Sequence, residues 1–305
     1  MTVFCLTIGM HFGGVWPVSQ VLDTLGVPAL DDAAGLPPAT IQRINEALYM
    51  LLGSGWDDSL SLDEGWWRDP ELDEIRVWVD TVLGRAGDSG IAAASDPRLS
   101  ILAPFWLDRM ARRGDEPRVV VVLSHPFQVA GALAYRYGTQ ERRAIHLWLK
   151  HMLWAERVSR GARRVILPVD RVRTHLYQAA EDLARGLAFD PAPSYRHDLE
   201  QKLLPTLKCP AAPAPDADDK VYGIDPLAQQ TYDLLLDAAA RDLEPAPAAL
   251  DDLRAAMLTR QRGFDPLLVD EVQALRRFDP VPDLEEETGS HGETDSDLRS
   301  LFRGS

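Results

Sequence analysis

Short apolar runs alternate with segments of helical periodicity along the first 190 residues of the chain. Apolar residues at every third or fourth position predict an amphipathic helix, whereas an unbroken apolar run predicts a strand buried on both faces. The predicted strands are Val3–Ile8, Gly90–Ala94, Arg118–Leu123 and Arg164–Val169. The predicted helices are Val18–Leu25, Thr40–Leu52, Pro70–Leu83, Pro104–Arg112, Pro126–Tyr137, Gln140–Ser159 and Thr174–Leu187. This alternation indicates an α/β protein with a parallel sheet flanked by helices.

The character of the sequence changes after residue 190. Proline- and alanine-rich linkers are predicted at 190–193 and 209–219, helices at Pro226–Arg241 and Ala246–Arg260, and a shorter helix at Pro266–Arg276. The stretch from Asp279 to Asp297 contains eight acidic residues and no basic one. Such composition is typical of disordered chain. We therefore expect an α/β domain at 1–190, a helical extension at 191–278 and a disordered acidic tail at 279–305.

Composition limits the classes of partner. The 305 residues carry 32 Lys and Arg against 47 Asp and Glu, a net charge of −15. A molecule of this charge repels nucleic acid and anionic membrane surfaces. The two cysteines make no disulfide framework, no apolar run reaches the length of a membrane span, and the N-terminus lacks the basic start of a signal peptide. We expect a cytoplasmic protein with a small-molecule partner; the oligomeric state stays open.

The first strand leads into the most informative segment, the glycine-bearing loop Met10–Trp16. A strand, a glycine loop and a following helix form the layout that cradles phosphate, because the loop and the helix start present backbone N–H groups. This loop contains no Lys, Arg, Ser or Thr, the side chains that usually supplement those N–H groups. The layout therefore predicts a phosphate-type frame without its usual side chains.

Polar side chains follow three of the predicted strands. His11 follows the first, Asp96 and Arg98 the second and His125 the third. The carboxyl ends of parallel strands meet at one sheet edge, so we expect His11, His125 and Arg98 to line one cleft. A histidine there can accept a proton, and Arg98 can hold an anion. The alternatives are a structural role for His11, a surface or capping role for His125 and a turn-capping role for Asp96.

Aromatic residues give a further candidate site. Trp16, Trp66 and Trp67 could form the floor of an aromatic acceptor pocket, although aromatic residues beside a loop also serve as ordinary packing. His146 and His151 are five positions apart on one predicted helix, which is not the i, i+4 spacing of a metal pair. The sequence therefore predicts no metal site.

Five segments, in order, resemble the bacterial sulfotransferases, which have a P-loop-like fold and use 3′-phosphoadenosine 5′-phosphosulfate (PAPS) as donor. The resemblance covers about residues 1–190. The segments are Gly9-Met10-His11 with Gly14 and Val21-Leu22, Gly65–Glu71, Asp96–Leu99 with Pro104–Trp106, Val119–Leu133, and Leu147–Arg157 with Val165–Val169. The resemblance implies that Gly13, Gly14, Arg98 and Ser124 lie at the donor site and that Trp66 and Trp67 lie on the acceptor side.

The departures from the family pattern fall on the donor contacts. Phe12, Val15, Ser95, Ser124 and Ala132 stand where the resemblance implies basic or hydroxyl side chains. A charge-assisted hydrogen bond contributes about 1.5–3 kcal/mol, so losing several of them weakens donor binding strongly.

Three functions remain open. The first is an enzyme that modifies a small molecule on this fold, with His11, His125 and Asp96 as catalytic candidates and weakened or lost use of PAPS. The second is a working PAPS-dependent sulfotransferase acting on a hydroxyl or an amine. The third is a relative without catalytic activity that binds a small molecule or a protein partner. The altered loop favours the first or the third over the second, whereas the family resemblance favours the second. The polar residues that persist near the predicted cleft, His11, His125 and Arg98, favour an enzyme over a relative without activity, and we expect an enzyme that modifies a small molecule.

Overall fold

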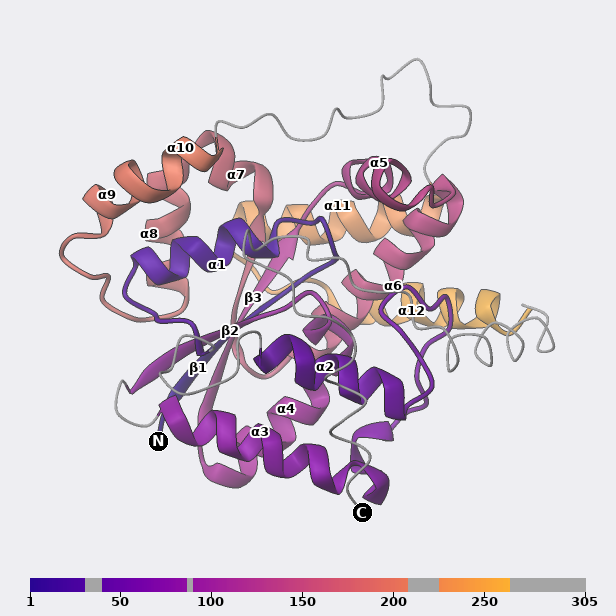
Figure 1. The fold of residues 1–305 in the computed structure, drawn as a ribbon. Coiled ribbons are helices and arrows are strands. Elements are labelled where there is room, and N and C mark those ends of the chain that lie inside the picture. Colours follow the sequence, from indigo (N-terminus) through magenta and orange to yellow (C-terminus); the bar gives the residue numbers. More distant parts are fainter. Residues whose placement is uncertain (31–39, 87–89, 208–224, 264–305) are drawn as a thin grey trace.

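The computed structural model describes residues 1–30, 40–86, 90–207 and 225–263. Its centre is a parallel sheet of four strands in the order β2-β1-β3-β4 (Figure 1). The strands are β1 (Val3–Ile8), β2 (Ile91–Ser95), β3 (Glu116–Leu123) and β4 (Arg163–Pro168). This confirms the predicted α/β class and the prediction that the first, third and fourth strands are neighbours in one sheet.

Helices cover both faces of the sheet (Figure 1). The longer helices are α1 (Val15–Thr24), α2 (Thr40–Leu51), α3 (Asp73–Arg85), α4 (Leu99–Arg113), α5 (Pro126–Tyr137), α6 (Glu141–Ser159), α8 (Leu176–Gly186), α11 (Pro226–Arg241) and α12 (Pro247–Gln261). The short elements are the 3₁₀ turns η2 (Trp66–Arg68) and η3 (Pro70–Leu72), helices α7 (Val169–Thr174), α9 (Tyr195–Asp198) and α10 (Leu204–Leu207), and the π-helix η5 (Leu199–Leu203).

Two apolar layers hold the helices to the sheet. Because successive strand residues point to opposite faces, Phe4, Leu6 and Ile8 of β1 enter one layer and Cys5 the other. The first layer packs against helices α2 to α6, and the second against α1, α7 and α8. The five residues from Val119 to Leu123 are almost completely buried, as their unbroken apolar run predicts.

Several predicted helices differ in their bounds; α1, for example, begins at Val15 and not at Val18. Helix α4 begins at Leu99 and includes Pro104, and it directly follows a turn in which the Asp96 carboxylate accepts the Arg98 backbone N–H at 2.8 Å. The segment predicted from Pro70 begins as a 3₁₀ turn before α3. The helix predicted from Thr174 begins at Leu176, because Thr174 ends the preceding helix α7 and the backbone of His175 is not helical.

The helices after residue 190 pack on the same core. Leu199 and Leu203 are buried against the layer that holds α1 and α8, and Leu235 and Met257 are buried in the layer of α6. A buried carboxylate, Glu156 of α6, joins this packing through ion pairs. The proposed boundary at residue 190 stays a prediction. The predicted helix Pro266–Arg276, the tail 279–305 and the linker 209–219 lie outside the described residues.

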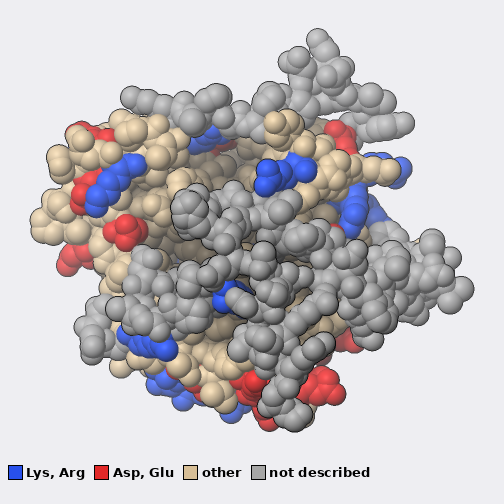
Figure 2. Space-filling model, viewed as in Figure 1, with Lys and Arg blue, Asp and Glu red and all other residues tan. Residues whose placement is uncertain are grey.

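The visible surface carries charges of both signs. In Figure 2 the blue and red side chains of the described residues are interspersed on this face. Within the described ranges, no helix has both the length and the apolar content that crossing a membrane requires.

Candidate functional site

The loop between β1 and α1 lies at the carboxyl edge of the sheet and packs tightly there. The Gly13 N–H donates to the Met10 carbonyl at 2.9 Å. A Cβ atom at Gly13 would lie 2.9 Å from the Ser124 Oγ. Gly14 has a φ of 91°, in the left-handed region, and a Cβ there would overlap a methyl group of Val169. The loop is therefore closely covered by the residues that follow β3 and β4.

Buried hydroxyl groups lie at the ends of three strands. Thr7 of β1 pairs with Ser95 of β2, and Ser124 follows β3. Their three Oγ atoms are buried, and none has a hydrogen-bond partner in the part of the chain that the structure describes. The Ser124 carbonyl accepts a hydrogen bond from the Trp148 indole at 3.0 Å. Neutral hydroxyls, which are weaker partners for an anion than a cationic side chain, therefore occupy this edge.

His11 is buried in the loop, with an exposed fraction of 6%. Its ring stacks on Trp56 with 4.1 Å between ring centroids, and the ring of His151 meets it edge-on at 6.1 Å. Burial, followed by electrostatic interactions with Arg98 and His151, lowers the pKa of His11 well below its usual range. Neither ring nitrogen has a hydrogen-bond partner among the described residues. The imidazole is therefore neutral at pH 7, with one donor and one acceptor unused.

His151 of α6 positions the surroundings of His11. Its Nδ1 lies 2.9 Å from the Ser100 Oγ, and its Nε2 lies 2.8 Å from the carbonyl oxygen of Trp56. Trp56 is also the residue on whose ring His11 stacks. The Ser100 hydroxyl in turn lies 2.6 Å from the Gly9 carbonyl at the start of the loop. Sequence reasoning considered His151 only as a metal ligand and missed this role. The available signal in the sequence was the position of His151 among apolar residues of a predicted helix, because a buried histidine needs hydrogen-bond partners.

Arg98 and Asp96 belong to a buried ion cluster. The Arg98 guanidinium lies 3.2 Å from the Asp96 carboxylate and 3.3 Å from that of Glu46. Burial by itself would lower the pKa of Arg98, but Asp96 and Glu46 outweigh it and raise this pKa. Burial also raises the pKa of Glu46, against the opposing charge of Arg98. One cation thus faces two carboxylates, which makes the cluster a poor anion site.

Helix α2 extends the cluster through residues that the sequence did not single out. The Asn45 amide donates to Asp96 at 3.0 Å and accepts from the Trp106 indole at 2.8 Å. The Tyr49 hydroxyl is buried and has no hydrogen-bond partner within the described ranges. Burial, modified by the charges of Arg98 and Asp96, raises the pKa of Tyr49. Asp96 therefore organises the turn and the network, and a neutral phenol lies within electrostatic reach of it.

His125 has a different structural role from His11. It is the N-cap of α5, and its Nδ1 accepts the Phe127 N–H at 3.3 Å while its own N–H donates to the Gln128 side chain. Its ring packs edge-on against Tyr232 of α11, with 4.8 Å between centroids. His125 thus serves as a capping residue, and the expectation that His11, His125 and Arg98 line one cleft stays a prediction.

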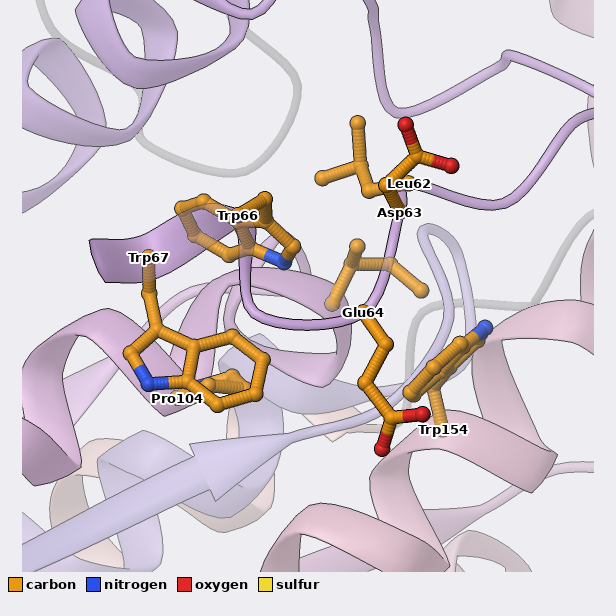
Figure 3. A pocket seen from close by; sticks show the side chains of 8 residues that line it. Leu62, Asp63, Glu64, Trp66, Trp67, Pro104 and Trp154 are labelled. Atoms are coloured by element: carbon orange, nitrogen blue, oxygen red, sulfur yellow. The ribbon is translucent and has the colours of Figure 1, made fainter. Parts of the chain in front are cut away.

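The predicted tryptophans lie in two places. Trp66 and Trp67 line a pocket with an empty volume of about 260 Å³, part of it open to solvent. Trp154 of α6 lies across the pocket from them, with Glu64 between (Figure 3). Trp16 is half-buried at the start of α1, where its carbonyl accepts the Ser19 hydroxyl. Trp154 was not predicted, because only the fold brings α6 beside the turn η2.

No group of three or more metal-ligating side chains is arranged to hold an ion within the described ranges. What the loop region offers is a neutral imidazole and buried hydroxyls. A neutral imidazole can bind a hydroxyl or an amine, donating through one nitrogen and accepting through the other.

Two solved structures are similar to this chain. The chain is similar to the sulfotransferase domain of the olefin synthase from Synechococcus PCC 7002, with 11% identity over 78% of this chain and 94% of that domain and a TM-score of 0.47. It is also similar to a sulfotransferase domain from the curacin biosynthetic pathway, with 12% identity, coverages of 81% and 99% and a TM-score of 0.42. No protein-family model and no curated protein sequence matches it.

Proposed function

We propose that the protein is an enzyme that modifies a hydroxyl or amine group of a small molecule, with His11 as the residue that binds this group and accepts its proton. The observation that carries the proposal is the buried, neutral imidazole of His11 with two unused nitrogens. An unsatisfied buried polar group costs about 1–3 kcal/mol, so a fold that retains two of them favours a ligand at that position.

The surroundings of His11 suit this role. Trp56 covers one face of the ring, and the Ser100–His151 pair holds Trp56 and the loop in place. A low pKa keeps the acceptor nitrogen free of a proton at pH 7, which a general base requires, although it also makes the imidazole a weaker base. Arg98 lowers that pKa, and its own charge is already paired with two carboxylates, so a neutral substrate group is favoured over a charged one.

The described residues fit PAPS poorly. The loop has no basic or hydroxyl side chain, its two glycines are closely covered by Ser124 and Val169, and Arg98 is already held by Asp96 and Glu46. The anionic donor would therefore meet backbone N–H groups and neutral hydroxyls alone. We expect binding of PAPS in the high-micromolar range or weaker, in line with the loss of about 5 kcal/mol of charge-assisted contacts.

Calorimetric titration with PAPS and with its desulfated product tests the donor. Weak or undetectable binding of both is the expected result, and low-micromolar binding would restore the ordinary sulfotransferase interpretation. The variant Phe12→Arg adds a cation to the loop at a half-buried position and should tighten binding if a missing charge is the cause.

The role of His11 is tested separately with ¹⁵N-labelled histidine in the full chain. A small alcohol or amine that binds should shift the ring nitrogens of His11, and products are then sought by mass spectrometry. His11→Phe, which preserves the aromatic stack on Trp56, should abolish both binding and conversion. Conversion that persists in this variant would refute the assignment of His11. Binding without conversion in the parent chain would favour a binding protein, which the closed ion cluster of Arg98 also favours.

A further inference from the structure

The segment between α2 and η2, residues 54–64, covers His11 and forms neither a helix nor a strand. We infer that this segment, called the strap below, is a lid that opens to give a small molecule access to His11. The inference rests on the function proposed for His11 only for the purpose that the opening serves. The opening itself can be measured without any substrate.

The strap is a thin cover. The indole of Trp56 lies on the His11 ring with 4.1 Å between ring centroids, and it also contacts the ring of Tyr137 at 5.9 Å. His11 is buried, whereas every residue of the strap except Asp58 is at least partly exposed. On this side, one layer of chain therefore lies between His11 and solvent.

Side chains of α6 hold the strap in place, mostly through its backbone carbonyls. All of them but His151 follow one another at intervals of three or four residues, which places them on one face of the helix. The bonds to carbonyls run from Arg143 to Asp57 (3.0 Å), His146 to Ser59 (3.0 Å), Lys150 to Asp58 and Leu60 (2.7 and 2.6 Å) and His151 to Trp56 (2.8 Å). Two bonds to strap side chains continue the row, from Trp154 to Ser61 (3.3 Å) and from Arg157 to Glu64 (2.9 Å). Figure 3 shows the end of the strap, where Glu64 extends to the side of Trp154.

This arrangement can open without disturbing the sheet. The strap lies at the surface, so water can replace the donors of α6 when the carbonyls move away. Gly53 and Gly65 flank the strap, and both have a left-handed backbone, with φ of 61° and 87°. Glycine tolerates the change of dihedral angles that a hinge requires. A Cβ atom at Gly65 would meet no heavy atom of the described residues within 4 Å, so no neighbour restricts rotation there.

The closed strap satisfies its own backbone but not the group beneath it. Trp56 gives His11 a ring contact, while both ring nitrogens of His11 have no hydrogen-bond partner in the part of the chain that the structure describes. A permanent cover normally supplies such a partner, because an unsatisfied buried group lowers stability. A cover that leaves the group unpartnered fits a site whose partner enters after the cover has opened.

The opening can be measured by reacting the full chain with diethyl pyrocarbonate and following the modification of each histidine by peptide mass spectrometry. This reagent attacks a neutral ring nitrogen, so His11 reacts only while it is uncovered. The exposed His197 reports the activity of the reagent itself. In parallel samples, labelling of Cys5 with a maleimide reports the opening of the sheet, because Cys5 is completely buried in β1.

Both reactions are run at urea concentrations below the unfolding transition. A local opening exposes little surface and depends weakly on urea, whereas unfolding of the sheet depends on it steeply. Relative to His197, modification of His11 should change less than about twofold up to about 1 M urea. Labelling of Cys5 should rise about fivefold or more over the same range.

Variants of α6 test how the strap is held. Arg143→Gln removes two bonds to the strap from an exposed position and should speed the modification of His11 about threefold. Arg142→Gln makes the same change of charge at the neighbouring exposed position and is the matched control. Lys150→Met removes two bonds to strap carbonyls and should speed it about tenfold or more. Labelling of Cys5 should stay at the parent rate, and Arg143→Gln decides alone if Lys150→Met does not fold.

Three results would overturn the inference. A urea dependence of His11 as steep as that of Cys5 would show that His11 is reached only by unfolding. Equal acceleration of His11 and Cys5 in the variants would show that α6 and the strap form part of the core. Equal rates in Arg143→Gln and Arg142→Gln would show that these bonds do not control access. A local opening without binding or conversion of an alcohol or amine would support the lid and refute the function proposed for His11.

Discussion

The two buried histidines beside the loop predict that the fold loses stability steeply in mild acid. His151 is fully buried, and burial, followed by the charge of Lys150, lowers its pKa from 6.5 to about 3. In the unfolded chain a histidine has its ordinary pKa. Below pH 6.5 the unfolded state therefore binds a proton at His151 that the folded state does not bind. The stability that neutral His151 contributes is complete above pH 6.5 and is lost as the pH falls toward 3.

The size of the effect follows from the two pKa values. Each pH unit between these two pKa values lowers the free energy of unfolding by about 1.4 kcal/mol. The loss is therefore about 2 kcal/mol at pH 5 and at most about 5 kcal/mol at pH 3. His11, whose pKa is also lowered, adds a loss of the same sign. Burial also lowers the pKa of His146, so the total loss exceeds the roughly 1.4 kcal/mol per pH unit of His151 alone, against a typical folding free energy of about 5–15 kcal/mol. Glu46, whose pKa is raised, opposes this because its protonated form favours the folded state.

Urea denaturation of the full chain from pH 7 to pH 5, followed by circular dichroism, measures this slope. In this window ordinary carboxyl groups titrate little, so the histidines dominate. His151→Gln can still donate to the Trp56 carbonyl but does not titrate, so its slope should be smaller by about 1.4 kcal/mol per pH unit. His197→Gln, at an exposed position, is the control. A slope in His151→Gln equal to that of the parent chain would refute the reasoning.

Three further predictions concern the unfolding free energy, measured in urea at pH 7. Gly14→Ala should lower it by about 2–4 kcal/mol, since the left-handed backbone and the overlap with Val169 both oppose a side chain. Adding Val169→Ala should recover part of this loss. Equal stability of the single and double variants would exclude the overlap as a cause. Glu156→Gln should lower the free energy of unfolding by about 3 kcal/mol, because it removes the buried carboxylate that two arginines share, one directly after α6 and one in β4. A loss below about 1 kcal/mol would show that those arginines find other partners. Ser124→Ala should be neutral or stabilising by up to about 1 kcal/mol, because the lost hydroxyl has no partner among the described residues; a clear loss would reveal a bound water or ligand there.

The sequence determined the parts of the fold that local periodicity encodes. The strand Val3–Ile8 and the helix Pro126–Tyr137 have the predicted bounds, because an apolar run and a 3.6-residue repeat follow from the burial of adjacent turns. The glycine loop was also predictable, since Gly13 and Gly14 follow a buried strand directly. Helix starts were less predictable. Pro104 suggested a first turn, whereas the helix begins five residues earlier, at Leu99, after the turn that the Asp96 carboxylate closes.

Only the tertiary structure decided which polar groups meet. Asp96 bonds Asn45, 51 residues away, and His151 contacts Ser100 and Trp56, which are 51 and 95 residues away. No local pattern encodes such pairs, because each side chain takes its partner from another element after the apolar layers have placed both. The same reason left His125 to cap α5 beside Tyr232 and set Trp154 across from Trp66. The sequence by itself thus determined the sheet, the loop and most helices. The packing of distant elements determined the charge of His11, the neutralisation of Arg98 and the composition of the indole pocket.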